Sequence, residues 1–383
     1  GIKSKRWKTS AEREIFASKV VGYNKCGECH KTSVDAWKQS HHFKSLDSLN
    51  NNANATAILT ALDLKGSPAS HSSCAQCHFT DQKTKSKNQF TQKNFGPVSG
   101  VSCESCHGPA QLWEEIHNKK SPKEIADKFA TLNSEDKKKL FLKKVQLKSA
   151  SEVSTLAQAT DFLTWKTTKL NTAGMIRPSM TYSLINNCYE CHTIGNRDLI
   201  NKTAEIDEPH AAGSEFEIVS WLSGEVIHNF KGADKDKPVN RALTLEKKRY
   251  LYIAGKLLFT EHALRALNKA TFPENEDDEP TRFYDEMLAR VGIGIEEINE
   301  INTTLEGNIP EIKAISEKLS VIQQKMEDEE FKKDDLGKAD QNLANFLQKQ
   351  NLLFLKNNSK NKSLMNLDET INSIEPRGTT FQP

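Results

Sequence analysis

The eight cysteines of this 383-residue chain form four pairs with two residues between the members, and a histidine follows each pair at once. The four copies of this C-x-x-C-H motif are Cys26/Cys29/His30, Cys74/Cys77/His78, Cys103/Cys106/His107 and Cys188/Cys191/His192. A C-x-x-C pair alone is compatible with half of a zinc site or with a redox dithiol. The histidine after every pair decides between these alternatives, because the complete motif is the attachment signature of c-type haem.

The spacing of the motif follows from the chemistry of haem attachment. Two thiols one short turn apart reach the two vinyl groups of one porphyrin, and the next residue lies beneath the iron as its proximal ligand. The sequence therefore predicts four covalently bound haem c groups. The predicted attachment residues are Cys26, Cys29, Cys74, Cys77, Cys103, Cys106, Cys188 and Cys191, and the predicted iron ligands are His30, His78, His107 and His192. Because every thiol is consumed as a thioether, no disulfide is expected.

Composition agrees with a chain that buries cofactors. Only 36% of the residues are hydrophobic and the mean hydropathy is -0.64, which is poor in apolar material for a core of this size. Four porphyrins would supply part of the missing apolar surface. No run approaches the roughly 18 apolar residues of a membrane span, so we expect a soluble protein.

Charge gives no support for a nucleic-acid partner, because 53 Lys and Arg residues nearly balance 51 Asp and Glu residues. The excess of basic residues lies in the half of the chain that carries the four motifs, where it can offset the haem propionates. Haem attachment takes place outside the cytoplasm, so we expect a prokaryotic periplasmic or otherwise extracytoplasmic protein whose signal peptide has been removed.

Seven histidines lie outside the motifs and are candidates for the sixth iron positions. They are His41, His42, His71, His117, His210, His228 and His262. Met175 and Met180 are alternative axial ligands upstream of the fourth motif.

The order and local spacing of the motifs resemble the tetrahaem cytochrome c-554 family over about residues 20–195. The resemblance rests on the motifs at Cys26 and Cys74, on the string Trp37-Lys38-Gln39-Ser40-His41-His42, and on Gly100-Val101-Ser102-Cys103-Glu104-Ser105-Cys106-His107-Gly108-Pro109 with His117 ten residues after His107. It implies that His42 and His117 are distal ligands to haems attached elsewhere in the chain.

The other histidines have weaker assignments. His41 lies one residue from the family position and is interpreted as a haem-edge or surface residue, and His71 stays unassigned. A third family ligand follows the fourth motif, where His210 and His228 are the candidates. His262 is less favoured, since its long helix can bury it for packing reasons alone.

The predicted fold class is mainly α with many loops, a multihaem cytochrome c core wrapped around four haems. We expect a tetrahaem domain over residues 1–272, with an extension from 196 to 272, and a haem-free helical region over 273–383. Helices are expected near 33–48, 109–119, 122–130, 134–148 and 244–269, after a basic lead-in and a short helix in residues 1–25. Alternation over 216–230 predicts a small hairpin around His228.

The region after residue 273 contains no cysteine and no histidine, and apolar residues recur in it every seven positions. The repeat runs through Ile298, Leu305, Ile312, Leu319 and Met326, with a helix break at Gly307-Asn308-Ile309-Pro310. A helical hairpin or bundle that covers the haem domain is one interpretation, and an oligomerisation or partner-docking coiled coil is the other.

Four haems in about 190 residues must lie close together, which favours electron transfer over isolated haem chemistry. The family resemblance implies a carrier that takes electrons from a multihaem oxidoreductase and passes them towards a membrane quinone-linked cytochrome. Two alternatives remain open. One is a redox enzyme acting on nitric oxide, nitrite or hydroxylamine at a five-coordinate haem, and the other is a subunit of a haem-stacking filament.

Overall fold

The computed structural model describes residues 9–228, 242–275 and 277–378. Residues 1–8 of the segment 1–25, for which a basic lead-in and a short helix were predicted, and residues 229 and 230 of the predicted hairpin lie outside these ranges. The described chain is mainly helical, with one short antiparallel pair of strands, so the predicted mainly α class is confirmed. No helix among the described residues is long and apolar enough to cross a membrane.

The chain divides into two compact units. The first takes in the chain up to Lys31, His42–Leu49 and Ala69–Met180, and the second takes in Thr32–His41, Asn50–Pro68 and the chain from Thr181. Three of the four motifs therefore lie in the first unit, and the fourth lies in the second with the C-terminal helices. The expected domain boundary at residue 272 stays a prediction.

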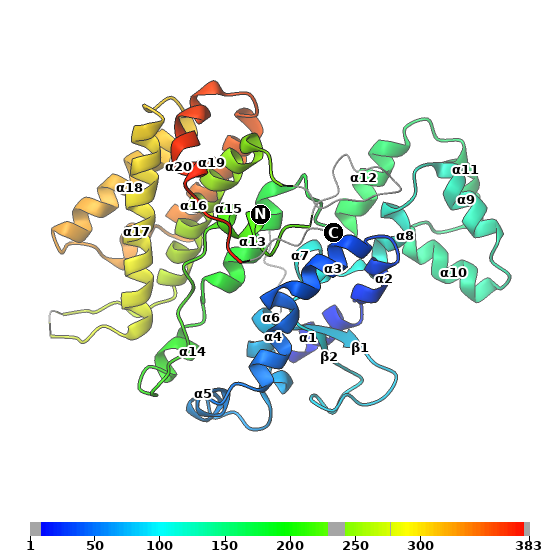
Figure 1. Cartoon of the computed structure of the whole chain (residues 1–383), viewed down its shortest axis with the longest axis horizontal. Coiled ribbons are helices and arrows are strands. Elements are labelled where there is room, and N and C mark those ends of the chain that lie inside the picture. The colour runs from blue at the N-terminus through cyan, green and yellow to red at the C-terminus, as the bar shows by residue number, and fades with distance from the viewer. Residues whose placement is uncertain (1–8, 229–241, 276, 379–383) are drawn as a thin grey trace. The chain divides into compact units, whose positions relative to one another are not determined.

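The first unit is built from short helices around one hairpin. Its elements are α1 (Ser10–Ala17), α2 (Tyr23–Gly27), α4 (His41–Asn50), η1 (Pro68–Ser70), α6 (Ser72–His78), β1 (Thr80–Lys83), β2 (Phe95–Ser99), α7 (Cys103–His107), η2 (Ala110–Leu112), α8 (Glu114–His117), α9 (Pro122–Ala130), α10 (Glu135–Lys144), α11 (Ala150–Ala157) and α12 (Phe162–Thr172). Helix α1 packs on the β1–β2 hairpin, and α9 packs on α11 (Figure 1).

A buried ion pair fastens α1 to the hairpin. Arg13 is 2% exposed, and its Nε and Nη2 donate to the two carboxylate oxygens of Asp81 at 2.7 and 2.9 Å. The same guanidinium also donates to the backbone carbonyls of Ala69 and Ser70 just before the second motif. Because these bonds satisfy the buried charge, removing either partner would leave an uncompensated ion in the core.

Helix starts in this unit follow from side chains that cap the first turn. Ser121 accepts a hydrogen bond from the Glu124 N–H, and Pro122 occupies the first helical position, as predicted for 122–130. The helix predicted over 33–48 is instead two helices, since the chain turns at Ser40, whose hydroxyl donates to the Trp37 carbonyl at 2.6 Å. The helix expected over 109–119 is reduced to η2 and the four-residue α8.

The second unit is dominated by long helices. Its elements are α3 (Lys31–Gln39), α5 (Ala55–Ala61), α13 (Thr181–His192), α14 (Arg197–Lys202), α15 (Ile218–Ser223), α16 (Leu245–Leu267), α17 (Arg282–Thr304), α18 (Pro310–Glu327), η3 (Lys333–Leu336), η4 (Ala339–Gln341), α19 (Leu343–Asn357), η5 (Lys362–Leu367) and α20 (Asp368–Asn372). The predicted long helix over 244–269 is confirmed, as is the break between α17 and α18.

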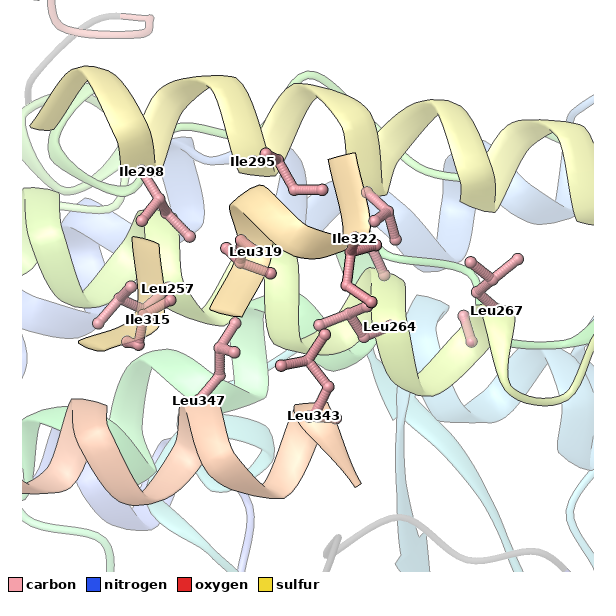
Figure 2. Close-up of a cluster of buried hydrophobic side chains, with 14 of the residues drawn as sticks. Leu257, Leu264, Leu267, Ile295, Ile298, Ile315, Leu319, Ile322, Leu343 and Leu347 are labelled. Atoms are coloured by element: carbon pink, nitrogen blue, oxygen red, sulfur yellow. The ribbon is translucent and has the colours of Figure 1, made fainter. Parts of the chain in front are cut away.

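Helices α16, α17, α18 and α19 share one hydrophobic cluster (Figure 2). The heptad residues Ile298, Leu305, Ile312 and Leu319 are each 0% exposed within this cluster. Figure 2 shows Leu319 and Ile322 between α17 and α19, close to Leu343 and Leu347. The seven-residue repeat is thus occupied by packing inside the chain.

Helix α13, which ends in the fourth motif, is joined to this cluster by a buried polar network. The Tyr182 hydroxyl donates to Glu261 of α16 at 2.8 Å, and Gln348 of α19 donates to the Tyr182 oxygen at 3.0 Å. Arg265 donates to the same Glu261 carboxylate at 2.9 Å. The C-terminal helices therefore support the helix that presents the fourth motif.

The predicted hairpin over 216–230 is wrong in its first half, where the structure has helix α15. The Glu217 side chain caps that helix by accepting the Ser220 N–H at 2.6 Å, while Ile218 and Val219 are buried against residues of α16. Capping and burial of one helix face outweigh the local alternation of apolar residues.

Candidate haem sites

Glu104, inside the third motif, connects the first and third motifs. Its side chain is 1% exposed, and its Oε1 accepts the N–H groups of Val21 and Ala110 at 3.0 and 2.7 Å. Its Oε2 accepts the Gly22 N–H at 2.8 Å, immediately before the helix that carries the first motif. Burial raises the pKa of Glu104, and the three backbone N–H groups oppose that rise.

The first cysteines of these two motifs are also neighbours. A hydrogen bond between the side chains of Cys26 and Cys103 lowers the pKa of Cys26, and the same contact together with burial raises the pKa of Cys103. The first and third haem attachment points therefore lie side by side within the first unit. In the second motif, burial raises the pKa of the Cys74 thiol.

The second cysteine of each motif lies at or just beyond the end of a helix, directly before the proximal histidine. Cys77, Cys106 and Cys191 are in the last turns of α6, α7 and α13, and Cys29 lies two residues after the end of α2. Cys29 is exposed, whereas Cys77, Cys106 and Cys191 are partly buried, as is Cys188 at the start of the fourth motif. All eight cysteines lie in the described part of the chain, and none forms a disulfide.

The side chains alone do not assemble a metal site. Within residues 9–228, 242–275 and 277–378, no group of three or more His, Cys, Asp or Glu residues is placed to hold a metal ion. A haem iron needs no such group, because the porphyrin supplies four ligands and the protein adds only the axial ones. The attachment roles of Cys29, Cys77 and Cys191, like those of the other five cysteines, stay predictions from the motif.

Ser45 brings the region of His42 to the second and third motifs. Its hydroxyl lies 2.7 Å from the His42 carbonyl oxygen and 2.6 Å from the His78 carbonyl oxygen, and it accepts the Val101 N–H at 3.2 Å. A Cβ atom on Gly100 would lie 2.0 Å from the His42 carbonyl oxygen. Only glycine at position 100 permits this close approach. This explains why a glycine begins the segment Gly100–Pro109 that carries part of the family resemblance.

The rings of His30 and His117 lie close together in the first unit. Their ring centroids are 6.2 Å apart and the ring planes differ by 29°. Two metal–imidazole bonds of about 2 Å each, plus roughly 1 Å from each ligating nitrogen to its ring centre, give a separation of about 6 Å. The separation of the His30 and His117 rings equals that of two axial imidazoles on one iron, and the assignment of His117 as a distal ligand stays a prediction.

The Nδ1 atoms of two histidines in the first unit are held by backbone carbonyls. His107 Nδ1 lies 2.8 Å from the Ile176 oxygen, and His117 Nδ1 lies 2.7 Å from the Glu114 oxygen. Such a bond puts the proton on Nδ1 and leaves Nε2 as the metal ligand. Burial lowers the pKa of His117, which favours the neutral imidazole that binds metals.

The fourth motif has an aromatic surrounding in the second unit. The His192 ring is stacked on Phe216 with centroids 4.4 Å apart and lies edge-on to Trp221 at 5.0 Å. Its Nδ1 lies 2.7 Å from the Ser214 hydroxyl, which again leaves Nε2 for iron. Tyr189, within the motif, is 2% exposed and packs on Phe216.

Both candidates after the fourth motif have the same type of Nδ1 contact. His210 Nδ1 lies 2.8 Å from the Ala211 oxygen, and His228 Nδ1 lies 2.5 Å from the Val226 oxygen. His210 is half-buried, and burial lowers its pKa, whereas His228 is exposed. The structure gives no separation between either ring and a motif histidine, so both assignments stay predictions.

The remaining histidines have structural partners. The His41 side chain is 87% exposed, and its Nδ1 lies 2.8 Å from the Glu225 carboxylate, as expected of a surface residue. His262 contacts Asn186 through Nε2 at 2.8 Å, so the nitrogen that ligates haem iron is already engaged. His71 occupies the N-cap position of α6, directly before the second motif.

Residues 25–108, which contain the first three motifs, match the family described as cytochrome c554 and c-prime. That segment is similar to the cytochrome c554 family. The chain is also similar to cytochrome c-554 of Nitrosomonas europaea, with 34% identity over 113 residues, or 29% of this chain and 47% of the relative. The chain thus spans about half the length of the curated relative it matches. No solved structure matched the chain.

Similarity to the cytochrome c554 family implies covalently bound haem c, in agreement with the motifs. The matched segment carries three of the four motifs, so the count of four haems remains a prediction from the sequence. Sequence reasoning missed Glu104, Ser45 and Ser214, which position the motifs and their histidines. Glu104 lies in the string that is most specific to the family, which is the one signal that could have revealed it.

Proposed function

We propose that this protein is an extracytoplasmic tetrahaem c-type cytochrome that carries electrons between redox partners through closely spaced haems. The four attachment motifs call for four haems, and the bonds from Val21 and Gly22 to Glu104, which join the first motif to the third, support short spacing between two of them. Such spacing suits a carrier, because each iron stores or releases one electron with little rearrangement of the protein.

The separation of His30 and His117 is the observation that carries the proposal. Two imidazoles on one iron leave no open position for a substrate and favour electron transfer over ligand chemistry. We propose His42, His210 and His228 as further distal ligands, which would make the haems mostly bis-His.

The protein's own residues orient the ligands. Backbone carbonyls hold Nδ1 of His107 and His117, and the Ser214 hydroxyl holds Nδ1 of His192, so that each Nε2 is presented to an iron. Glu104 keeps the first motif beside the third. Ligands held in place favour electron transfer, because no side chain has to move when the iron changes its oxidation state.

We propose a multihaem oxidoreductase as donor and a membrane quinone-linked cytochrome as acceptor, both met outside the cytoplasm. Residues 1–272 would form the tetrahaem part, and residues 273–383 a haem-free support for it. Association of copies through the C-terminal helices would need surfaces other than the buried heptad residues.

Haem counting and electron paramagnetic resonance (EPR) of the oxidised protein test the proposal. We expect four haems per chain, and we expect His117→Ala to convert one low-spin haem to high spin because it removes an axial ligand. His262→Ala is the matched control, because Nε2 of His262 contacts Asn186. This variant should leave the EPR spectrum unchanged. Fewer than four haems, or an unchanged spectrum in His117→Ala, would contradict the proposal.

A further inference from the structure

Arg290, in the haem-free C-terminal region, lies against the segment that holds the fourth motif's histidine. It belongs to α17, and its guanidinium carbon lies 5.7 Å from the ring centre of Phe259 on α16. Its Nη1 is 3.5 Å from the Ser214 carbonyl oxygen. A Cβ atom on Gly213 would lie 2.3 Å from Arg290 Nη2, so the guanidinium covers the Gly213–Ser214 peptide.

That peptide is attached to the fourth motif on both sides of Ser214. The Ser214 N–H donates to the His192 carbonyl oxygen at 3.1 Å, and the Ser214 hydroxyl lies 2.7 Å from His192 Nδ1. Gly213 also forms an antiparallel bridge with Thr193. The position of the hydroxyl that holds the His192 ring therefore depends on how this peptide is packed.

The Arg290 guanidinium is partly buried, and the carboxylate of Glu286 on the same helix acts on its charge. Arg290 Nε is buried and has no hydrogen-bond partner among the residues that the structure describes. A planar guanidinium held flat over a glycine peptide provides shape as well as charge, and lysine cannot reproduce that shape. Gly213 is the residue that makes room for it.

We propose that Arg290 is a positioning residue for the fourth haem, which holds Ser214 in place and thereby sets the orientation and redox potential of the His192–iron bond. This inference rests on the proposed haem attachment at the fourth motif. The hydrogen bond from the second ring nitrogen fixes ring orientation and raises ligand basicity, and a more basic ligand stabilises ferric iron. Loss of the Ser214 contact therefore raises the potential of that haem.

Redox titration of the purified haem-loaded protein tests the inference in four variants. Ser214→Ala is expected to raise one of the four midpoint potentials, with a tenfold change in the ferric-to-ferrous ratio corresponding to about 59 mV for one electron. Arg290→Lys keeps the charge and loses the flat guanidinium, so it should shift the same haem in the same direction. The double variant should match Ser214→Ala alone, because both changes remove one contact.

Arg197→Lys is the matched control, because Arg197 is half-exposed and pairs with Asp198 at 3.4 Å. This variant should leave all four midpoint potentials unchanged. Should Arg290→Lys fail to fold, Arg290→Gln replaces the guanidinium by a shorter neutral side chain and must shift the same haem. Unchanged potentials in Arg290→Lys, or additive shifts in the double variant, would overturn the inference alone. A wild-type count of three haems would overturn the proposed function and this inference with it.

Discussion

Replacing Glu104 by glutamine tests whether the buried carboxylate holds the first and third motifs together. Its Oε1 accepts two backbone N–H groups and its Oε2 accepts the Gly22 N–H. A glutamine can keep the two bonds on one oxygen, but its amide NH₂ then faces the Gly22 N–H, and two donors cannot bond to each other. One buried donor left unpaired costs about 1–3 kcal/mol.

The loss of charge has two opposing effects. It weakens the two charge-assisted bonds on Oε1, and it removes the burial penalty of the carboxylate that raises the pKa of Glu104. We therefore expect the free energy of unfolding to fall by about 1–3 kcal/mol in Glu104→Gln, the cost of the unpaired donor. Guanidinium titration of the haem-loaded protein, followed by the Soret band, measures this change.

Glu28→Gln is the matched control, since Glu28 also lies inside a C-x-x-C-H motif but is 61% exposed and paired with an exposed Lys25. Exposed pairs of this type contribute at most about 1 kcal/mol. If Glu104→Gln destabilised the protein no more than Glu28→Gln does, Glu104 would not hold the two motifs together in the way the hydrogen bonds indicate.

Three further predictions follow from packing and charge. Gly100→Ala places a Cβ atom 2.0 Å from the His42 carbonyl oxygen. The free energy of unfolding of this variant, measured by the same guanidinium titration, should therefore fall by more than about 2 kcal/mol. Leu319→Ala opens a cavity in a fully buried position and should cost about 2–5 kcal/mol by thermal unfolding, and a loss under about 1 kcal/mol would refute the packing. Burial raises the pKa of Glu261, although the Tyr182 hydroxyl and the Arg265 guanidinium oppose that rise. The Glu261 carboxyl group therefore contributes fully to stability below the pKa that it has in the unfolded chain. This contribution is lost as pH rises through the pKa that it has in the folded protein. The stability of wild type relative to Glu261→Gln should therefore fall as pH rises above 4.5, the ordinary pKa of a glutamate, and an opposite slope would contradict it.

Local features of the sequence predicted the parts of the fold that depend on local interactions. Ser121 and Pro122 mark the start of α9, and the Gly307–Pro310 break separates α17 from α18, because caps and helix breakers act within a few residues. The expected hairpin over 216–230 was wrong because the burial of Ile218 and Val219 depends on α16, which is distant in sequence.

The sequence alone determined the haem chemistry, since attachment of a porphyrin needs two thiols and a histidine at fixed spacing and nothing else from the chain. Tertiary structure decided which candidate histidine lies beside the first motif. His30 and His117 are separated by 87 positions, and only the packing of α8 and the first motif in one unit brings their rings to 6.2 Å. It also placed Glu104 and Ser214 against backbone atoms that no spacing rule connects to them, because buried polar groups are satisfied by whichever segment folds beside them.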